Sequence, residues 1–384
     1  MYKRQFQDRF GISYEQLGLL ILLNFGTQIA ADVFATKYVD RLGYRRPCVA
    51  ANLLSATGLI CLGILPLAMP PFAGLAVATV LYAVGGGFTE VVTSPIVESC
   101  PGDEKAKAMS LLHSFYCWGQ VVVVLVSTLL LKLFGHDFWF LLPLIWSVIP
   151  FVTAALFTRV PLMPTLSEEA KTPLKRLFVS KIFILAMVIM VCSGASEIAM
   201  SQWSSLFAER ALQVSKVFGD LFGPCLFAVL MGVGRTVYGL YGHKMNLHKI
   251  LIGSSVLCAA CYLTAALAKN PVLALAACAL TGLSISLMWP GMLSLTAKNY
   301  PAGGTSMFGV LAICGDIGCS AAPFLVGLFS QQFQDTSMCA GLMVSTGQSM
   351  DQLGLKFGLL MSIFFPLIMV VCLLFFQRKK KNKI

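Results

Sequence analysis

The chain has 384 residues, of which 57% are hydrophobic and only 12% are charged. Soluble globular domains contain about 45–50% apolar and about 25% charged residues, so this composition excludes an ordinary soluble fold. A net charge of +11 would suit a nucleic-acid-binding protein, but the Lys and Arg residues lie in short links between apolar runs and in the tail. Membrane proteins place their positive charge in this way, so we expect a membrane protein that does not bind nucleic acid.

Apolar runs of about 20 residues recur along the whole chain, and each is long enough to cross a hydrocarbon core of about 30 Å. The links between them are short and contain Gly, Pro or charged residues, as breaks between helices do. We therefore predict an all-α membrane protein. The expected membrane helices are 16–38, 47–69, 72–97, 107–133, 138–160, 182–207, 217–241, 247–268, 271–298, 304–331 and 353–377.

One long polar link divides the hydrophobic runs into two blocks that look weakly alike. A glycine-rich helix followed by a proline-bearing link occurs as Gly85–Gly87 to Pro101 and again as Gly282 to Pro301. Repeats joined by a polar loop are typical of secondary transporters, although shared membrane-helix composition also produces some likeness. The expected organisation is an N-terminal helical bundle (1–164), a central loop (165–181), a C-terminal six-helix bundle (182–377) and a basic tail (378–384).

Lys and Arg residues are concentrated in alternate links, and this asymmetry predicts the orientation of the chain. The central loop and the C-terminal tail belong to the basic set and are expected to be cytoplasmic, with 335–351 outside. The same parity places a basic N-terminus outside, which is unusual. We therefore expect that a first helix is missing from this sequence.

The segment Thr36–Arg46 carries a family resemblance. It resembles the loop motif of the major facilitator superfamily, G-x-x-x-D-R-x-G-R-R/K, and it departs from it at Thr36, where glycine is usual, and at Tyr44, where a basic residue is usual. That loop joins the family's second and third helices, so the resemblance implies a two-bundle fold with about 11 of 12 helices; a generic basic cytoplasmic loop is the alternative. The matching residues are Asp40, Arg41, Gly43, Arg45 and Arg46.

Within that superfamily the chain looks most like the fucose permease type, which are sugar:proton symporters. The supporting stretches are Gly85–Glu90 with Pro95, and Leu111–Tyr116. The resemblance implies a sugar as the solute and a proton gradient, with no cofactor, as the energy source. The glycine and proline run that is usual in drug antiporters does not occur in Trp118–Lys132, which disfavours an efflux pump.

Charged residues inside apolar runs are the strongest functional candidates, because each costs about 2.5–3.5 kcal/mol at a helix centre on insertion scales. Glu90 resembles the acidic proton carrier of the fucose permease, and Asp32 is the second candidate for proton coupling. Glu197 and Arg235 form either a substrate site or a structural ion pair. Each carboxyl also has the alternative of a purely structural hydrogen-bonded role. The remaining polar candidates for the substrate site are Asp316 and His113.

Aromatic and amide side chains can bind a sugar by stacking and hydrogen bonding. Gln202 and Trp203 lie just beyond one helical turn past Glu197 and form the most suggestive cluster. Packing or anchoring at the membrane interface is the alternative role for each aromatic residue. The other substrate-binding candidates are Trp118, Gln120 and Trp289.

Enzyme motifs such as H-E-x-x-H, G-x-S-x-G, the Walker loop and the dinucleotide fingerprint do not occur. We therefore predict no enzymatic activity, no metal and no ATP-driven step. The expected function is a secondary active transporter, monomeric in the lipid of the plasma membrane, that moves a small polar solute by proton-coupled alternating access. The alternatives are a proton-coupled exporter of amphipathic compounds and, from another class, a non-transporting membrane sensor.

Overall fold

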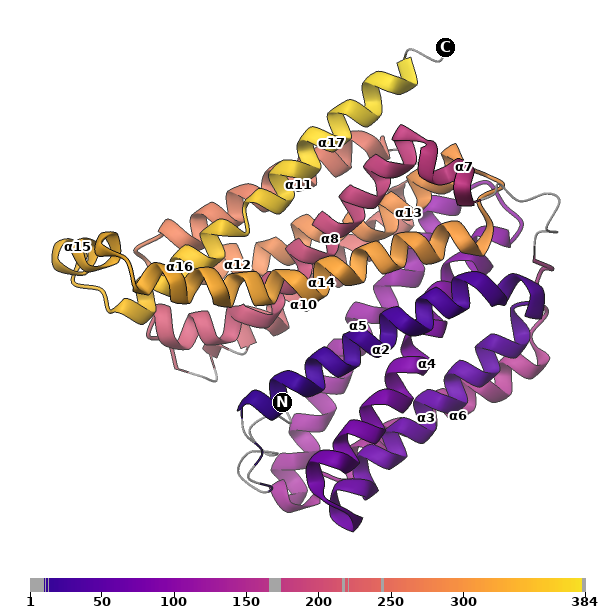
Figure 1. Ribbon diagram of the computed structural model, residues 1–384, viewed down its shortest axis with the longest axis horizontal. Coiled ribbons are helices and arrows are strands. Elements are labelled where there is room, and N and C mark those ends of the chain that lie inside the picture. Colours follow the sequence, from indigo (N-terminus) through magenta and orange to yellow (C-terminus); the bar gives the residue numbers. More distant parts are fainter. Residues whose placement is uncertain are drawn as a thin grey trace. The chain divides into compact units, whose positions relative to one another are not determined.

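The computed structural model describes residues 10, 12, 14–165, 174–215, 218–219, 221–242 and 245–381 (Figure 1). In this part of the chain every regular element is a helix. Ten of the described helical segments are long and apolar enough to cross a membrane, and α2, the first helix whose bounds are described, has 29 residues. The predicted all-α membrane fold is confirmed. The central loop around Lys171 and the last residues of the tail lie outside the described residues.

The helices follow the predicted ranges closely in the first half of the chain. Those that precede the central loop are α2 (Tyr14–Leu42), α3 (Arg45–Ala68), α4 (Pro71–Ser99), α5 (Lys105–Phe134), the short η1 (His136–Phe138) and α6 (Leu141–Arg159).

The second half departs from single uninterrupted spans, since several expected helices are divided and the short α7 and α15 were not expected. The elements are α7 (Leu174–Val179), α8 (Lys181–Leu206), η3 (Phe207–Ala211), η4 (Leu221–Cys225), α10 (Leu226–Tyr241), α11 (Leu247–Leu267), α12 (Pro271–Ile285), α13 (Met288–Asn299), α14 (Gly304–Gln334), α15 (Ser337–Thr346), α16 (Met350–Met361) and α17 (Phe364–Lys381).

Two of the expected spans are divided at a serine that lies four residues before a proline. Proline has no N–H group, so the carbonyl four residues earlier loses its helical hydrogen bond. Pro290 follows the break at Ser286, between α12 and α13, and Pro366 follows the break at Ser362, between α16 and α17. The released carbonyl of Ser362 accepts instead from the Phe365 N–H, at 3.2 Å. The proline spacing thus explains both interruptions.

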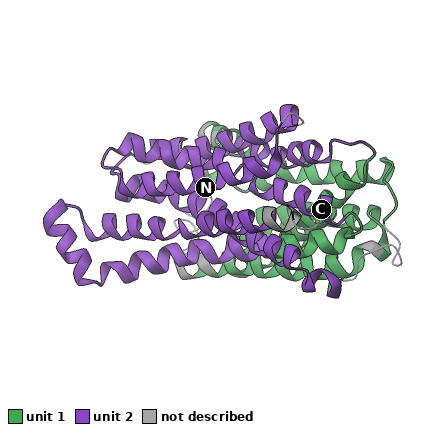
Figure 2. Ribbon diagram, turned by 90° about the horizontal axis from the view of Figure 1, so that it is seen from above, with its two compact units in different colours: residues 1–101, 122–174, 301–313 green, residues 102–121, 175–300, 314–384 purple. Residues whose placement is uncertain are grey.

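The described chain forms two compact units, which do not follow chain order (Figure 2). The boundary predicted between 164 and 182 remains a prediction, because two helices are each shared between the units: α5 begins in unit 2 and α14 begins in unit 1. The first half of α5 belongs to unit 2 because it packs closely on α10. The first half of α14 belongs to unit 1 because it packs closely on α2. Unit 1 contains 1–101, 122–174 and 301–313, and unit 2 contains 102–121, 175–300 and 314–384.

In unit 1, α3 packs against both α4 and α6, and α2 packs against α4 (Figure 1). A glycine permits the close approach of α3 and α4: a Cβ atom at Gly58 would lie 2.5 Å from the backbone nitrogen of Tyr82. One apolar cluster joins helix ends far apart in sequence, because Leu75, Leu131 and Trp139 are all buried in it. This packing fixes α4, which carries Glu90.

In unit 2, α12 packs against α10 and α11, and α17 packs against α8 and α11. The interior of this unit contains the fully buried side chains of Phe183, Ile189, Met190 and Tyr262. The Tyr262 hydroxyl donates a hydrogen bond of 2.8 Å to the Ser196 carbonyl on α8. The residue next to this carbonyl is Glu197, so α11 helps to position the functional face of α8.

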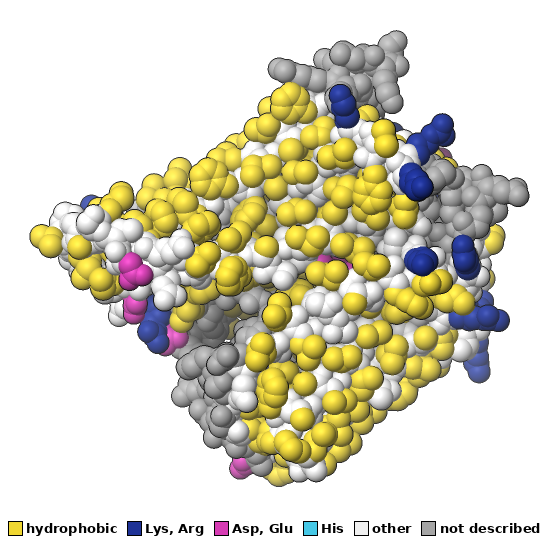
Figure 3. Space-filling model, in the orientation of Figure 1, with side chains coloured by type: hydrophobic (Ala, Val, Ile, Leu, Met, Phe, Trp, Pro, Cys, Tyr) yellow, Lys and Arg dark blue, Asp and Glu magenta, His cyan; other side chains and the backbone are white. Residues whose placement is uncertain are grey.

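Hydrophobic side chains cover the visible lateral faces of each unit, and the Lys and Arg side chains gather near helix ends (Figure 3). Large apolar residues that would be costly to expose to water, such as Leu22, Phe134, Val272 and Phe324, are more than half exposed. In a bilayer these side chains meet lipid tails, which are as apolar as they are. The chain is therefore a multi-pass membrane protein.

Candidate functional site

The first polar cluster, which we call the Glu90 site, lies between α2 and α4 in unit 1. Gln28 and Asp32 are four residues apart and therefore share one face of α2, while Gly87 and Glu90 share the facing side of α4. The Gln28 side-chain amide donates a hydrogen bond of 2.8 Å to the Glu90 carboxylate. Two predicted proton-coupling residues, Asp32 and Glu90, are thus presented by two helices that pack together.

Gly87 makes the close approach of these two helices possible. A Cβ atom at this position would lie 2.6 Å from the Asp32 carboxylate and 2.8 Å from the Gln28 carbonyl. Asp32 itself is fully buried. The neighbouring Gly86 does not take part in this close contact, because a Cβ atom there would meet no atom within 4 Å. Gly87 holds α2 and α4 at the separation that allows Gln28 to reach Glu90.

The second cluster, the Arg235 site, is centred on a buried guanidinium of α10 in unit 2. Arg235 is 2% exposed. Its Nη2 donates to the Glu197 carboxylate on α8 at 3.3 Å, and its Nη1 donates to the His113 carbonyl on α5 at 2.9 Å. Nη1 also donates to the Cys117 Sγ at 3.3 Å. Glu197 and Arg235 therefore form an ion pair, one of the two roles left open by the sequence, and α5 joins it through a backbone carbonyl.

A proline-released carbonyl supplies the shortest contact of this guanidinium. The Arg235 Nε donates to the Ser286 carbonyl at 2.8 Å. Because Pro290 cannot donate to that carbonyl within the helix, it is left available at the break between α12 and α13. A buried carbonyl without a donor would cost about 1–3 kcal/mol, so the break and the arginine stabilise each other. Four helices, α5, α8, α10 and α12, meet at one side chain.

The first half of α5 is held against α10 by further contacts around Arg235. The Ser110 hydroxyl donates to the Arg235 carbonyl at 2.7 Å, and the Trp118 indole donates to the Thr236 hydroxyl at 3.0 Å. The Tyr116 ring lies over the Arg235 guanidinium, 5.9 Å from its centroid. Tyr116 is 56% exposed although it neighbours this buried group. Its ring is therefore the accessible face of the Arg235 site.

The structure places the other predicted substrate residues in different surroundings. The Trp203 indole donates to the Pro323 carbonyl on α14 at 3.1 Å, and the Trp289 ring packs directly on Gly315. Asp316 is buried beside that glycine. Gln202 is exposed and Gln120 is half-buried. Trp118, Trp203 and Trp289 thus connect helices within unit 2, and their assignment to the substrate remains a prediction.

The loop motif is positioned by its glycine and by one of its arginines. Gly43 has a φ of +71°, a left-handed conformation that terminates α2 and that glycine adopts readily. Arg45 donates to the Phe157 carbonyl and the Val160 carbonyl, both at 2.9 Å, and also to the Thr158 carbonyl. These are carbonyls at the end of α6, which have no partner within the helix. Arg41 and Arg46 are exposed, and the Asp40 side chain lies outside the described residues.

The departure from the family motif at Thr36 has a structural counterpart on α14. The Ser306 hydroxyl donates to the Thr36 carbonyl at 3.0 Å, within unit 1. A Cβ atom at Gly309 would collide with the Thr36 hydroxyl. Where the family motif has glycine, this chain has threonine, and the glycine that permits the close contact lies on the facing helix.

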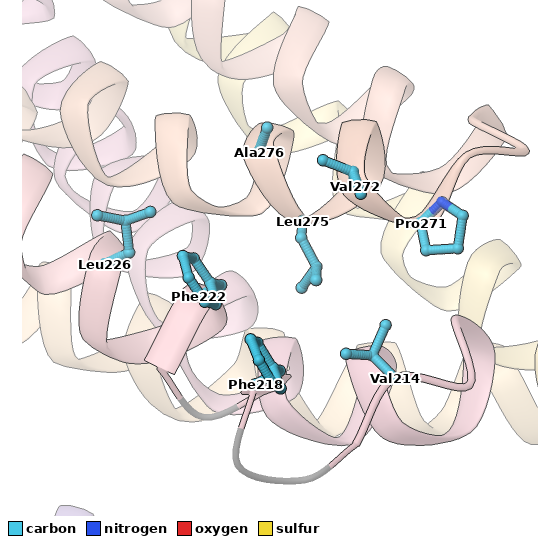
Figure 4. A pocket seen from close by; sticks show the side chains of 8 residues that line it. All are labelled: Val214, Phe218, Phe222, Leu226, Pro271, Val272, Leu275 and Ala276. Carbon is cyan, nitrogen blue, oxygen red and sulfur yellow. The ribbon is translucent and has the colours of Figure 1, made fainter.

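An apolar cavity of about 310 Å³ lies within unit 2, between η4, the start of α10 and the start of α12 (Figure 4). The rings of Phe218 and Phe222 are stacked, with centroids 5.8 Å apart, and face Leu275 across it. The described residues that line it all have apolar side chains. This cavity suits hydrocarbon rather than a polar solute. In the described part of the chain, no group of three or more His, Cys, Asp or Glu side chains could hold a metal ion.

Reasoning from the sequence missed Gln28, Ser286 and the role of Tyr116. Gln28 had a detectable signal, because it lies one helical turn before Asp32 in an otherwise apolar run. Ser286 also had one, since it lies four residues before Pro290. The position of Tyr116 over Arg235 had none, because it depends on the packing of α5 against α10.

Comparison with known proteins matches residues 4–323 to the family model for the Major Facilitator Superfamily. Among solved structures, the E. coli fucose:proton symporter is 16% identical, with 96% of this chain and 92% of that chain covered and a TM-score of 0.74. The proton:xylose symporter XylE is 13% identical, with coverages of 98% and 90% and a TM-score of 0.76.

A third solved structure, the human organic anion transporter MFSD10, is 14% identical, with 96% of this chain and 88% of that chain covered and a TM-score of 0.69. At such identities these likenesses show the fold alone. A comparison with curated protein sequences finds no match.

Proposed function

Because the chain belongs to the Major Facilitator Superfamily, we propose that this membrane transporter is a proton-coupled symporter of a small polar solute, and that the solute is a sugar. The observation that carries the proposal is the Glu90 site. A carboxyl group lies within an apolar membrane helix, and a neutral amide, that of Gln28, donates a hydrogen bond to it. Apolar surroundings disfavour the charged form of a carboxyl, whereas a donor stabilises it, so this half-buried position suits proton binding and release.

Glu90 is the proton-coupling residue in this proposal, and Asp32 is the second carboxyl of the same site. An amide can donate to a carboxylate and can accept from a carboxylic acid, so Gln28 is able to bond Glu90 in both protonation states. A proton could then be exchanged while the hydrogen bond between Gln28 and Glu90 is kept. Each tenfold difference in proton affinity between two transporter states supplies about 1.4 kcal/mol of coupling.

The Arg235 site supports a hydroxyl-rich solute. The exposed ring of Tyr116 offers an aromatic face, which suits the C–H face of a sugar. Two of the structures that share this fold are, by their titles, symporters of fucose and xylose. The other predicted substrate residues, including His113 and Gln120, remain candidates for the same role.

The test separates exchange from uphill transport in proteoliposomes that contain the purified chain. Glu90→Gln keeps the size and hydrogen-bonding capacity of the side chain but fixes it as neutral. We expect this variant to retain counterflow of a radiolabelled monosaccharide and to lose accumulation driven by a pH gradient. Glu104→Gln is the matched control, because this glutamate is exposed and its carboxylate lies 2.9 Å from the Lys107 amine near the start of α5. Undiminished uphill uptake by Glu90→Gln would falsify the assignment.

An exporter of amphipathic compounds is the second candidate, and the apolar cavity between η4 and α12 is the observation that favours it. Such a cavity could accept the hydrocarbon part of an amphipathic molecule. The direction of transport distinguishes the two: an acid-outside gradient would drive a symporter to accumulate its solute inside the vesicle, whereas it would drive an exporter to exchange protons for solute in the opposite direction.

A further inference from the structure

The charges of the Arg235 site are balanced within unit 2. Arg235 and Glu197 are both buried, with side chains that are 3% and 11% exposed, and their charged atoms are 3.3 Å apart. We propose that Glu197 is the charge-specificity determinant of the transporter: by neutralising Arg235 it makes the Arg235 site electroneutral, so that the site accepts uncharged polyhydroxyl solutes and excludes their carboxylated counterparts. This inference rests on the proposed function and names the substrate class of the same site.

Neutral groups, rather than Glu197, fix the position of the guanidinium. The two shortest contacts of Arg235 are with the backbone carbonyls of Ser286 at 2.8 Å and His113 at 2.9 Å. The contact with Glu197 is a single bond at 3.3 Å, longer than the paired bonds by which arginine grips a carboxylate. The carbonyls satisfy the donors and leave the positive charge uncompensated. The distinctive contribution of Glu197 is therefore its negative charge.

The Tyr116 ring is the surface at which a bound solute would interact with the charge of Arg235. It lies over the guanidinium and is more than half exposed. Two unit charges about 10 Å apart at an effective dielectric constant of about 20 interact strongly enough to change a binding constant by about tenfold. Without Glu197, Arg235 would attract an anion at Tyr116 with this strength. With Glu197, the two opposite charges largely cancel at that distance.

A purely structural ion pair predicts different behaviour. In that case, removal of Glu197 would destabilise the protein and would weaken transport of every solute in the same proportion. In the proposal, the ratio between an anionic and a neutral solute changes. The readout is therefore a ratio, measured for two probes that share one ring: D-galactose, which is neutral, and D-galacturonate, which carries a carboxylate.

Counterflow of both probes is measured in proteoliposomes for the unchanged chain and for three variants. The unchanged chain is expected to prefer galactose. Glu197→Gln is expected to raise the galacturonate-to-galactose ratio by about tenfold. The double variant E197Q/R235Q removes both charges, so its ratio should return to that of the unchanged chain. Asp351→Asn is the matched control, because it removes a carboxylate that lies 3.9 Å from an arginine at an exposed position, Arg210, and it should leave the ratio unchanged.

A binding measurement decides the inference independently of transport. Thermal unfolding of each purified variant is followed with and without galacturonate, and galactose serves as the neutral reference. Galacturonate should stabilise Glu197→Gln more than it stabilises either the unchanged chain or E197Q/R235Q, because only the single variant has an uncompensated Arg235. Equal stabilisation of all three would overturn the inference, since it would mean that Arg235 does not act on a bound solute.

The outcomes separate the inference from the proposed function. If the unchanged chain transports neither probe, the result contradicts the proposal that the solute is a sugar. The unfolding measurement still decides the role of Glu197. If Glu197→Gln does not fold, the preference of the unchanged chain decides instead: stronger counterflow of galacturonate than of galactose would refute an electroneutral site. If all proteins fold and transport but Glu197→Gln keeps the original ratio, Glu197 has a structural role only.

Discussion

Two arginines, Arg45 in unit 1 and Arg235 in unit 2, bind backbone carbonyls for related reasons but in different environments. Arg45 is exposed and binds carbonyls at the end of α6, where Pro161 cannot donate to the Phe157 carbonyl. Arg235 is buried and binds the Ser286 carbonyl, which Pro290 leaves available. The difference is burial: water can replace Arg45 at its carbonyls, whereas nothing in the interior can replace Arg235. Burial also explains why Arg235 is paired with a carboxylate.

The largest effect is expected for the buried arginine. Arg235→Gln removes the partner of the Glu197 charge and donors to the Ser286 and His113 carbonyls. Breaking a buried ion pair by removing one partner costs about 3–5 kcal/mol, and we expect a destabilisation of this size in thermal unfolding of the detergent-purified protein. E197Q/R235Q should recover part of the loss. If Arg235→Gln were as stable as the unchanged chain, burial would not be what distinguishes the two arginines.

The next effect is steric and concerns the Glu90 site. Gly87→Ala would place a Cβ atom 2.6 Å from the Asp32 carboxylate, so α2 and α4 must separate. Overpacking of this kind costs about 1–3 kcal/mol, and we also expect slower pH-driven uptake, since Gln28 would lose its reach to Glu90. Gly86→Ala, in the same triplet, meets no atom within 4 Å and is the control. Identical melting temperatures and uptake rates for the two variants would contradict this account.

A smaller effect is expected for the exposed arginine. Arg45→Ala releases the carbonyls at the end of α6, but water can hydrate them, so the net loss should be that of ordinary hydrogen bonds, about 0.5–1.5 kcal/mol each at most. Thermal unfolding should place this variant well above Arg235→Gln in stability. Arg46→Ala, which changes the adjacent exposed arginine, is expected to be close to the unchanged chain. A loss at Arg45 as large as that at Arg235 would remove burial as the explanation.

The smallest effect is expected for the loss of a hydrogen bond from an uncharged donor, the Trp203 indole. Trp203→Phe keeps an aromatic ring but removes the indole N–H that binds the Pro323 carbonyl, together with the outer ring carbons that pack near Gly327. We expect the lost hydrogen bond to contribute a destabilisation of about 1 kcal/mol, as a neutral hydrogen bond does. The apparent KM for a transported monosaccharide should be unchanged if Trp203 has only a packing role. A clear rise in KM with little loss of stability would instead support the predicted substrate contact.

The candidate site was partly predictable because charge inside an apolar run is conspicuous. Asp32, Glu90, Glu197 and Arg235 were all identified in this way, and the pairing of the last two was anticipated as one of two possibilities. The hydrogen bond from Gln28 to Glu90 was not anticipated, because it depends on how closely α2 approaches α4. The indole hydrogen bonds of Trp118 and Trp203 were also beyond prediction, since composition does not distinguish a packed aromatic residue from one that contacts solute.

The sequence by itself determined the fold class, the positions of most membrane helices and the family resemblance. These follow from local properties: the length of apolar runs, the spacing of charge and a contiguous loop motif around Gly43. Only the tertiary structure decided which half of α5 and α14 belongs to which unit, and which carbonyls the arginines satisfy. The physical reason is that a helix is specified by neighbours along the chain, whereas its partners are specified by shape. Glycines such as Gly87 and prolines such as Pro290 act by permitting close contacts or releasing hydrogen bonds, and their effect depends on the helix that lies opposite.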